Sequence, residues 1–257
     1  MRNARTEKLK GIIRPFFFKL FKQTGKTYLC PICGYKGPFK DKRISKTPDL
    51  IRTDSKCPKC ASNERHRMMF LVLNEVFNTT EKQGKSVLHI APEECLKDMV
   101  AEKFETYHTA DLLKQDVDFN EDVQDMSFSD NSYDCVVISR VLTVPPDLDA
   151  SLSEIHRVLK PGGLAVIAEI YKHDETVEFG KMINERSREI GIDLIDKIDN
   201  VFGKTECFSS DRYDDQYQLA NKMVLDGQPT DNFPDKVKIN NVGFSELVVI
   251  GKVANKT

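Results

Sequence analysis

The sequence lacks the long apolar segments that a membrane-spanning protein needs. Its longest strongly apolar stretch, residues 12–21, is interrupted by Arg14 and Lys19, whereas a bilayer-spanning helix takes about 18 or more consecutive apolar residues. The first residues also lack the uninterrupted apolar core and small-residue cleavage site of a secretory signal. Internal repeats and low-complexity tracts are absent as well. We therefore expect a cytoplasmic protein without a membrane span.

The charge of the chain is divided unevenly, although its net value is only −2. Residues 1–70 hold 18 Lys and Arg against 5 Asp and Glu, and residues 71–257 hold 20 against 35. Such an asymmetry is typical of proteins with an anionic partner, so nucleic acid is a predicted partner of the basic N-terminal part. The alternative is that each part is solvated by itself or docks on the other.

The cysteines predict a metal site rather than disulfides. In a reducing compartment thiols stay free, and four of the seven cysteines form two C-x-x-C pairs, Cys30 with Cys33 and Cys57 with Cys60. Two residues between paired cysteines let both sulfurs reach one ion, and four thiolates make a closed tetrahedral site without an open position for water. We predict a structural Zn²⁺ at these four cysteines, with iron as the alternative that suits the same geometry.

The pattern along the chain predicts four regions. Residues 1–27 form a basic amphipathic arm with a helix over about 15–23, whose stretch 12–22 is expected to pack on the protein itself or, alternatively, to associate with a membrane surface. Residues 28–65 form the zinc ribbon and residues 66–84 a connecting helix. Residues 85–257 form a Rossmann-like domain in which residues 191–235 are an insertion over the rim of the sheet.

Short apolar runs alternate with helical patterns from residue 85 onward. Strands are expected over residues 87–91, 107–110, 133–138 and 164–170, and helices over 94–104 and 148–159. Residues 237–239 and 247–253 predict a hairpin that adds an antiparallel edge. The predicted fold class is α/β, a Rossmann-like, doubly wound and mostly parallel sheet preceded by a small zinc ribbon.

Two motifs beside the strands expected over residues 133–138 and 164–170 resemble class I S-adenosylmethionine-dependent methyltransferases of the type 11-like group. The sequence D-N-S-Y-D at residues 130–134 is similar to that family's D-x-S-F-D before the fourth strand, and R-V-L-K-P-G-G at 157–163 matches its motif before the fifth. The second motif is architectural, because Pro161 and the glycines shape a turn into the sheet. The resemblance covers about residues 28–170 and implies the same fold and cofactor.

The resemblance also implies which residues hold the cofactor. Asp111 occupies the position of an acidic residue that accepts hydrogen bonds from the ribose hydroxyls, and Asp122 that of a contact to the adenine amino group, with Val123 covering the ring. The alternative is that these acidic residues only cap helices. The predicted cofactor-binding set is completed by His89, Ala91, Glu93, Leu112 and Ser139.

The first motif departs from the family pattern. Residues 89–93 read H-I-A-P-E, whereas the family usually has an acidic residue followed by G-x-G-x-G, whose glycines let the backbone approach the cofactor. Together with the cysteine pairs and E-R-H-R at residues 64–67, this segment resembles a subset of bacterial zinc-ribbon methyltransferase-like proteins. In that case Glu93 would accept from the methionine ammonium; the alternative is that Glu93 and Glu94 only favour a helix N-terminus.

Residues after the fourth and fifth strands face the substrate in this architecture, which nominates Arg140, Glu169 and His173 as catalytic, with His173 as a general base. The predicted function is methyl transfer from S-adenosylmethionine to an unidentified acceptor, either RNA or a sugar or small metabolite. The alternative is a non-catalytic methyltransferase-like scaffold or a nucleic-acid-binding protein that uses the zinc ribbon.

Overall fold

The structure, a computed structural model, describes Pro15, Phe18 and residues 26–44, 47–77, 83–230, 232–239 and 243–255. The chain divides into two compact units. The cysteine unit comprises Met1–Leu71, Ser210–Asn232 and Lys238–Glu246, and the parallel-sheet unit comprises Val72–Ser209, Phe233–Val237 and Leu247–Thr257. The predicted basic arm and its helix lie outside the described residues, apart from Pro15, Phe18, Lys26 and Thr27.

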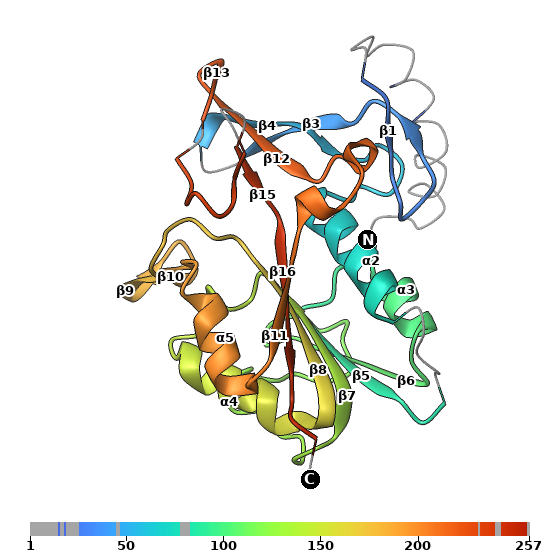
Figure 1. Cartoon of the computed structure of the whole chain (residues 1–257), viewed down its shortest axis with the longest axis vertical. Helices are drawn as coiled ribbons and strands as arrows, with labels where there is room; N and C mark the ends of the chain where they lie inside the picture. Colours follow the sequence, from blue (N-terminus) through green and yellow to red (C-terminus); the bar gives the residue numbers. More distant parts are fainter. Residues whose placement is uncertain are drawn as a thin grey trace. The chain divides into compact units, whose positions relative to one another are not determined.

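The parallel-sheet unit is built on a mixed, mostly parallel sheet with the strand order β11-β16-β8-β7-β5-β6 (Figure 1). β6, β5, β7 and β8 pair in parallel, whereas β16 is antiparallel to β8 and β11 is antiparallel to β16. The predicted fold class is confirmed for this unit, including the antiparallel side. The strands are β5 (Ser86–Ile90), β6 (Thr106–Ala110), β7 (Tyr133–Ser139), β8 (Leu159–Glu169), β11 (Thr205–Ser209) and β16 (Leu247–Lys252).

The middle strands are almost entirely apolar because both faces of the sheet are covered. Residues 135–138 of β7 and 165–168 of β8 are at most 1% exposed, and such continuous apolar runs are typical of parallel strands. Helices α4 (Leu148–Val158) and α5 (Leu194–Phe202) lie on one side of the sheet, and α3 (Lys97–Glu102), shorter than predicted, lies on the other (Figure 1). The side chain of Asp147 begins α4 by accepting from the Ala150 N–H at 2.9 Å.

The two family-like motifs face each other across the start of β7 and β8. Arg157 contacts Asp130 at 2.8 Å, and Lys160 contacts Asp134 at 2.7 Å. Gly162 has a φ of +77°, a left-handed conformation that favours glycine. The motifs therefore hold the amino ends of the strands together, which explains why they predict the fold better than the activity.

The cysteine unit contains a second sheet, with the strand order β14-β15-β12-β4-β3. A separate short hairpin carries the first cysteine pair at its turn. The strands of the sheet are β3 (Lys40–Ile44), β4 (Thr47–Lys56), β12 (Ala220–Leu225), β14 (Lys238–Ile239) and β15 (Gly243–Ser245), with β13 (Gln228–Pro229) paired to β12; the short hairpin is β1 (Tyr28–Leu29) and β2 (Lys36–Gly37), and η1 (Ser210–Arg212) and η2 (Asp215–Tyr217) are 3-10 turns. Helix α2 (Glu64–Val76) begins here and starts earlier than predicted.

The observed units follow different boundaries from the predicted regions. Residues 191–235 were expected as one insertion over the rim of the parallel sheet, but residues 210–232 belong to the cysteine unit, where β12 pairs antiparallel with β4. The expected terminal hairpin is also different, because β14 pairs with β15 while β16 crosses into the other sheet beside β8. Within the described part of the chain, none of the helices combines the length and apolar character that a membrane crossing demands.

A hairpin of β9 (Val177–Ile183) and β10 (Arg186–Glu189) extends from the parallel-sheet unit. Nearly all residues of β9 are exposed. The hairpin is attached at its base, where Arg188 is 1% exposed and donates to the carbonyls of Leu142, Pro145 and Pro146 at 2.6–2.8 Å. These bonds join the hairpin to the loop that follows β7.

Candidate functional site

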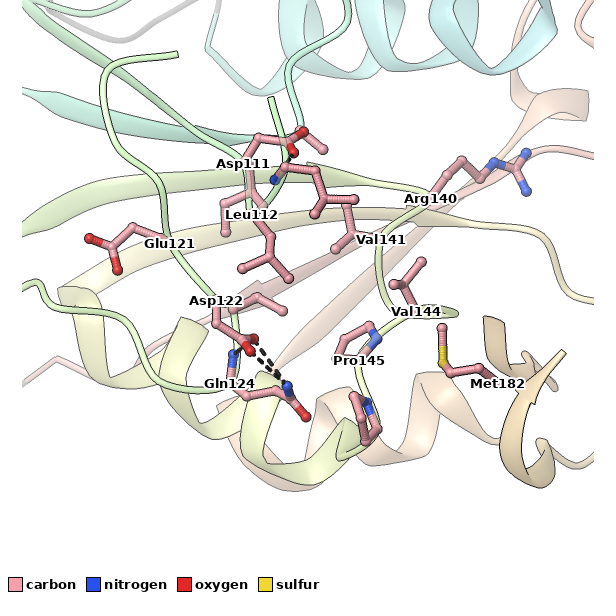
Figure 2. Close-up of a pocket in the computed structure, with 15 residues that line it drawn as sticks. Asp111, Leu112, Glu121, Asp122, Gln124, Arg140, Val141, Val144, Pro145 and Met182 are labelled. Atoms are coloured by element: carbon pink, nitrogen blue, oxygen red, sulfur yellow. Dashed lines mark hydrogen bonds between the residues drawn. The ribbon is translucent and has the colours of Figure 1, made fainter. Parts of the chain in front are cut away.

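A cavity of about 420 Å³ lies beyond the carboxyl ends of β5, β6 and β7. This edge of a parallel α/β sheet is where such folds bind ligands, and the volume lies within the range of small-molecule sites. Figure 2 shows acidic and amide side chains toward one end of the cavity and apolar ones toward the other. The lining residues are Ile90, Ala91, Asp111, Leu112, Leu113, Glu121, Asp122, Val123, Gln124, Arg140, Val141, Val144, Pro145, Pro146 and Met182.

Asp111 follows β6 directly, and its carboxylate lines the cavity. Its Oδ1 accepts from the N–H groups of Leu113 and Lys114 at 2.9 and 3.0 Å, and its Oδ2 lies 3.5 Å from the Lys114 ammonium. Partial burial acts to raise the pKa of Asp111, but these N–H groups and the Lys114 charge outweigh it, so the pKa lies below its ordinary value. The carboxylate is therefore ionised and acts only as a hydrogen-bond acceptor.

Asp122 lines the same cavity, 11 positions later, and is oriented by Gln124. The carboxylate accepts from the Gln124 backbone N–H at 2.9 Å and from the Gln124 amide at 3.0 and 3.1 Å (Figure 2). The Gln124 Oε1 in turn accepts from the N–H of Asp147 at 2.8 Å. Gln124 thus fixes Asp122 relative to the start of α4, a positioning contact that the sequence did not reveal.

The glycine-free loop after β5 turns at Ala91. This residue lines the cavity and has a φ of +51°, in the region that normally favours glycine. His89 and Glu93, predicted as cofactor contacts, lie outside the cavity lining: His89 is fully buried, with Nδ1 3.1 Å from the Tyr107 hydroxyl and Nε2 3.4 Å from Glu93. The structure therefore pairs His89 with Glu93 inside the unit.

The three predicted catalytic residues are not gathered at the cavity, because only Arg140 belongs to its lining. Arg140 lines the cavity, but Figure 2 shows its guanidinium pointing away from the other labelled residues. Glu169 is 2% exposed and accepts from the Leu142 N–H at 2.9 Å; burial raises its pKa, while the Arg140 charge acts to lower it. His173 contacts Glu189 at 2.9 Å, and His173 and the buried Ser139 both lie outside the lining.

The apolar end of the cavity comes from residues that the sequence analysis did not single out. Val141, Val144, Pro145 and Pro146 belong to the loop after β7, and Met182 comes from β9. Met182 has no local signal, because it is brought to the cavity by the bonds that attach the hairpin to the loop after β7, among them those of Arg188.

The four predicted metal ligands converge in the cysteine unit. The sulfurs of Cys30, Cys33, Cys57 and Cys60 all lie within 4.8 Å of one another, and two of the separations, Cys30 to Cys60 and Cys33 to Cys57, are 3.6 Å. A tetrahedral ion with zinc–sulfur bonds of about 2.3 Å would separate the sulfurs by ~3.8 Å, whereas a disulfide would need about 2.05 Å. The spacing therefore fits a four-thiolate ion.

Two similar turns present these cysteines. The N–H of Gly34 donates to the Cys30 carbonyl at 2.9 Å, and the N–H of Ala61 donates to the Cys57 carbonyl at 3.0 Å. Gly34 and Ala61 have nearly the same left-handed φ, +68° and +62°. Ala61 therefore takes the turn position in the second knuckle that glycine takes in the first.

The polar cluster after the second knuckle is structural in this geometry. Arg67 is fully buried and donates to four carbonyls: Ser55 at 2.9 Å, Ser62 at 3.0 Å, Tyr217 at 2.9 Å and Gln218 at 2.5 Å. His66 lies outside the metal-ligand group; its Nδ1 accepts from the Asn63 N–H at 3.2 Å. Arg67 thus ties the second knuckle to the segment that precedes β12.

The segment around the cavity matches the model of a known protein family. Residues 75–167 match the family model described as a methyltransferase domain. The match includes the strands β5, β6 and β7, whose ends form the cavity, and helix α4. This part of the chain is therefore similar to a methyltransferase domain.

Relatives and solved structures are similar over parts of the chain. Demethylmenaquinone methyltransferase of Staphylococcus epidermidis is 31% identical over 132 residues, which cover 50% of this chain and 47% of that protein. The polyketide synthase-nonribosomal peptide synthetase ACE1 of Pyricularia oryzae is 34% identical over 67 residues, 26% of this chain and 2% of that protein. The chain thus spans less than half the length of these relatives. A SAM dependent methyltransferase structure from Archaeoglobus fulgidus covers 74% of this chain and 95% of its own, with 12% identity and a TM-score of 0.49.

Proposed function

We propose that this chain binds S-adenosylmethionine at the carboxyl edge of the parallel sheet and transfers its methyl group to an acceptor. The observation that carries the proposal is that Asp111 and Asp122 line one cavity. When bound, the cofactor supplies an electrophilic methyl group on a sulfonium. Asp111 and Asp122 would hold the adenosyl part, and the methyl group would pass to a lone pair of the acceptor, with S-adenosylhomocysteine as the leaving group and the acceptor's proton released to solvent.

The residues at the acidic end suit an adenosyl group. The ionised Asp111 keeps acceptor capacity beyond its two backbone contacts, because a carboxylate offers about four lone-pair positions for donors such as ribose hydroxyls. Asp122, held by Gln124, offers an acceptor for an amino group. Val123 and Leu112 contribute apolar surface to the same lining. The contribution of the protein to such a displacement is chiefly the placement of the two reactants.

We further propose that the four cysteines hold a structural Zn²⁺. The support is the sulfur spacing and the absence of an open coordination position in a four-thiolate set. The ion would stabilise a small unit whose apolar cluster consists of Tyr28, Tyr35 and Phe39 beside the cysteines. Iron remains the alternative, and metal analysis of the purified chain distinguishes the two.

Calorimetric titration of the full chain with S-adenosylhomocysteine tests the cofactor site. Wild-type protein should bind, and Asp111→Asn and Asp122→Asn should each weaken binding by about 10- to 100-fold, because a charge-assisted hydrogen bond contributes about 1.5–3 kcal/mol. Asn at either position can still accept the backbone N–H contacts, so the loops should keep their shape.

Asp125→Asn is the matched control, because Asp125 is exposed, close to Asp122 in the chain and outside the cavity lining. Its affinity should stay within twofold of wild type. A wild-type chain without affinity for S-adenosylhomocysteine would contradict the proposal and favour the non-catalytic scaffold.

A further inference from the structure

Exposed apolar side chains gather at the mouth of the cavity. Among the described residues, seven large hydrophobic side chains are at least 39% exposed. Four of them line the cavity, and two more lie on the β9–β10 hairpin that contributes Met182. The six are Leu112, Leu113, Val144, Val177, Met182 and Ile183, whereas the seventh, Leu225, belongs to the cysteine unit. Exposed apolar side chains that line a cavity are typical of a binding site.

The hairpin that carries three of these residues is hydrogen-bonded to the loop after β7. An isolated two-stranded hairpin is marginally stable in water, so its attachment decides whether it can form a fixed wall. Besides the three bonds from Arg188, the Ser187 hydroxyl donates to the Val144 carbonyl at 2.7 Å, and the Ser187 N–H donates to the Thr143 carbonyl at 2.9 Å. Val144 and Met182 therefore belong to one wall of the cavity.

The charges around the cavity disfavour an anionic ligand. Asp111, Glu121 and Asp122 place three carboxylates in the lining. Lys114 lies 3.5 Å from Asp111 and is engaged there, and the Arg140 guanidinium points away from the cavity and acts on the buried Glu169. No cationic group of the described lining is therefore directed at a phosphate or carboxylate of a ligand.

We propose that the acceptor is a neutral small molecule with an aromatic or aliphatic body that packs on Val144, Pro145 and Met182, the end of the cavity opposite Asp111 and Asp122. This inference rests on the proposed function and specifies its substrate class. An RNA acceptor does not fit this wall, because it would bring phosphates to a cavity lined by carboxylates. The β9–β10 hairpin is then the element that selects the acceptor.

The test uses the full chain saturated with S-adenosylhomocysteine and titrated with 2-naphthol, a neutral aromatic alcohol whose fluorescence reports binding. Met182→Asp and Val144→Asp should each weaken 2-naphthol binding by at least about tenfold, while S-adenosylhomocysteine affinity stays within twofold. Leu225→Asp places the same charge on an exposed apolar residue of the cysteine unit and should leave both affinities unchanged. The anionic congener 2-naphthoate should bind at least about tenfold more weakly than 2-naphthol.

Several outcomes would overturn the inference while leaving the cofactor site intact. These are S-adenosylhomocysteine binding without 2-naphthol binding, 2-naphthol affinity unaffected by Met182→Asp, and displacement of 2-naphthol by a single-stranded RNA oligomer. Binding of neutral phosphatidylcholine vesicles that Met182→Asp abolishes would also overturn it, because the patch would then dock on lipid. Failure of S-adenosylhomocysteine itself to bind would instead remove the proposed function on which the inference rests.

Discussion

The buried guanidinium of Arg67 provides a sharp test of how the cysteine unit is stabilised. It donates to carbonyls on both sides of the unit, Ser55 and Ser62 near the cysteines and Tyr217 and Gln218 before β12. It also lies 4.6 Å from the centre of the Phe39 ring. Burial acts to lower the pKa of Arg67, whereas Glu64 and the nearby thiolates act to raise it. The cation therefore interacts favourably with the proposed metal site.

Replacement by methionine keeps an unbranched apolar stem but removes all four donors. The Ser62 carbonyl still accepts from the Cys57 N–H at 2.9 Å, so the loss falls mainly on the other three carbonyls. Leaving buried partners of a charged group unpaired costs about 3–5 kcal/mol in total. This corresponds to an opening equilibrium that is roughly 10² to several thousand times more populated.

Hydrogen–deuterium exchange measured by mass spectrometry reports this change separately for each unit. In Arg67→Met, peptides from β4 and β12 should exchange roughly 10² to several thousand times faster than in the wild type. The exchange rates of peptides from β7 and β8 should not change. Zinc affinity, measured by competition with a chelator, should fall by about 10- to 100-fold, as for other groups that support metal ligands. Arg67→Lys should recover much of the zinc affinity but not the protection, because one ammonium cannot reproduce the guanidinium's planar fork.

Arg43→Met is the matched control, because Arg43 lies on β3 of the same unit and is exposed. The reasoning is refuted if Arg67→Met exchanges within threefold of wild type in β4 and β12. Equal acceleration by Arg43→Met would also refute it, because removal of any positive charge would then suffice.

Three further predictions concern the metal, the acid stability and the loop after β5. Elemental analysis should find about one zinc ion per wild-type chain and far less in Cys33→Ser; equal zinc content in the two would exclude a four-thiolate site. Lys160 and Ser86 hold the pKa of Asp134 below its ordinary value despite burial, so this carboxylate stabilises the fold above about pH 4 and the stability is lost as the pH falls further. In Asp134→Asn the urea concentration at the unfolding midpoint should therefore fall less steeply than in the wild type as the pH is lowered from about 5 to 3. The same pH dependence in both proteins would contradict the assignment. Ala91→Val should lower the unfolding free energy by about 1–3 kcal/mol, because a β-branched residue fits poorly at the φ of +51° that residue 91 adopts. Ala91→Gly should be tolerated. A lower thermal unfolding midpoint for Ala91→Gly than for Ala91→Val would argue against strain at this turn.

The core of the parallel-sheet unit could be predicted because its strands are buried on both faces. The runs at residues 87–91, 107–110 and 133–138 each fall within two residues of an observed strand. The same is true of α4, whose apolar positions recur at helical spacing and whose buried face includes Leu148, Leu152 and Ile155. Helix α3 was predicted too long, because propensity alone does not define where its ends fall.

The candidate sites could be predicted where the chemistry follows from spacing along the chain. Paired cysteines and the acidic residues 111 and 122 are local features, and the structure brings each set to one place. His89 and Glu93 were assigned to the cofactor by their position after β5. The structure instead pairs them with each other and His89 with Tyr107 on the neighbouring strand, a contact that no local pattern encodes.

The sequence by itself determined the parallel strands, the motifs at their amino ends and the four thiolates, because burial periodicity and ligand spacing operate over a few residues. Only the tertiary structure decided that β12, which follows β4 by more than 160 residues, completes the sheet of the cysteine unit. It also decided that Met182 reaches the cavity and that Arg67 holds two distant segments together. These contacts join polar or exposed segments whose partners lie far away in the chain, so they become defined only when the whole chain is folded.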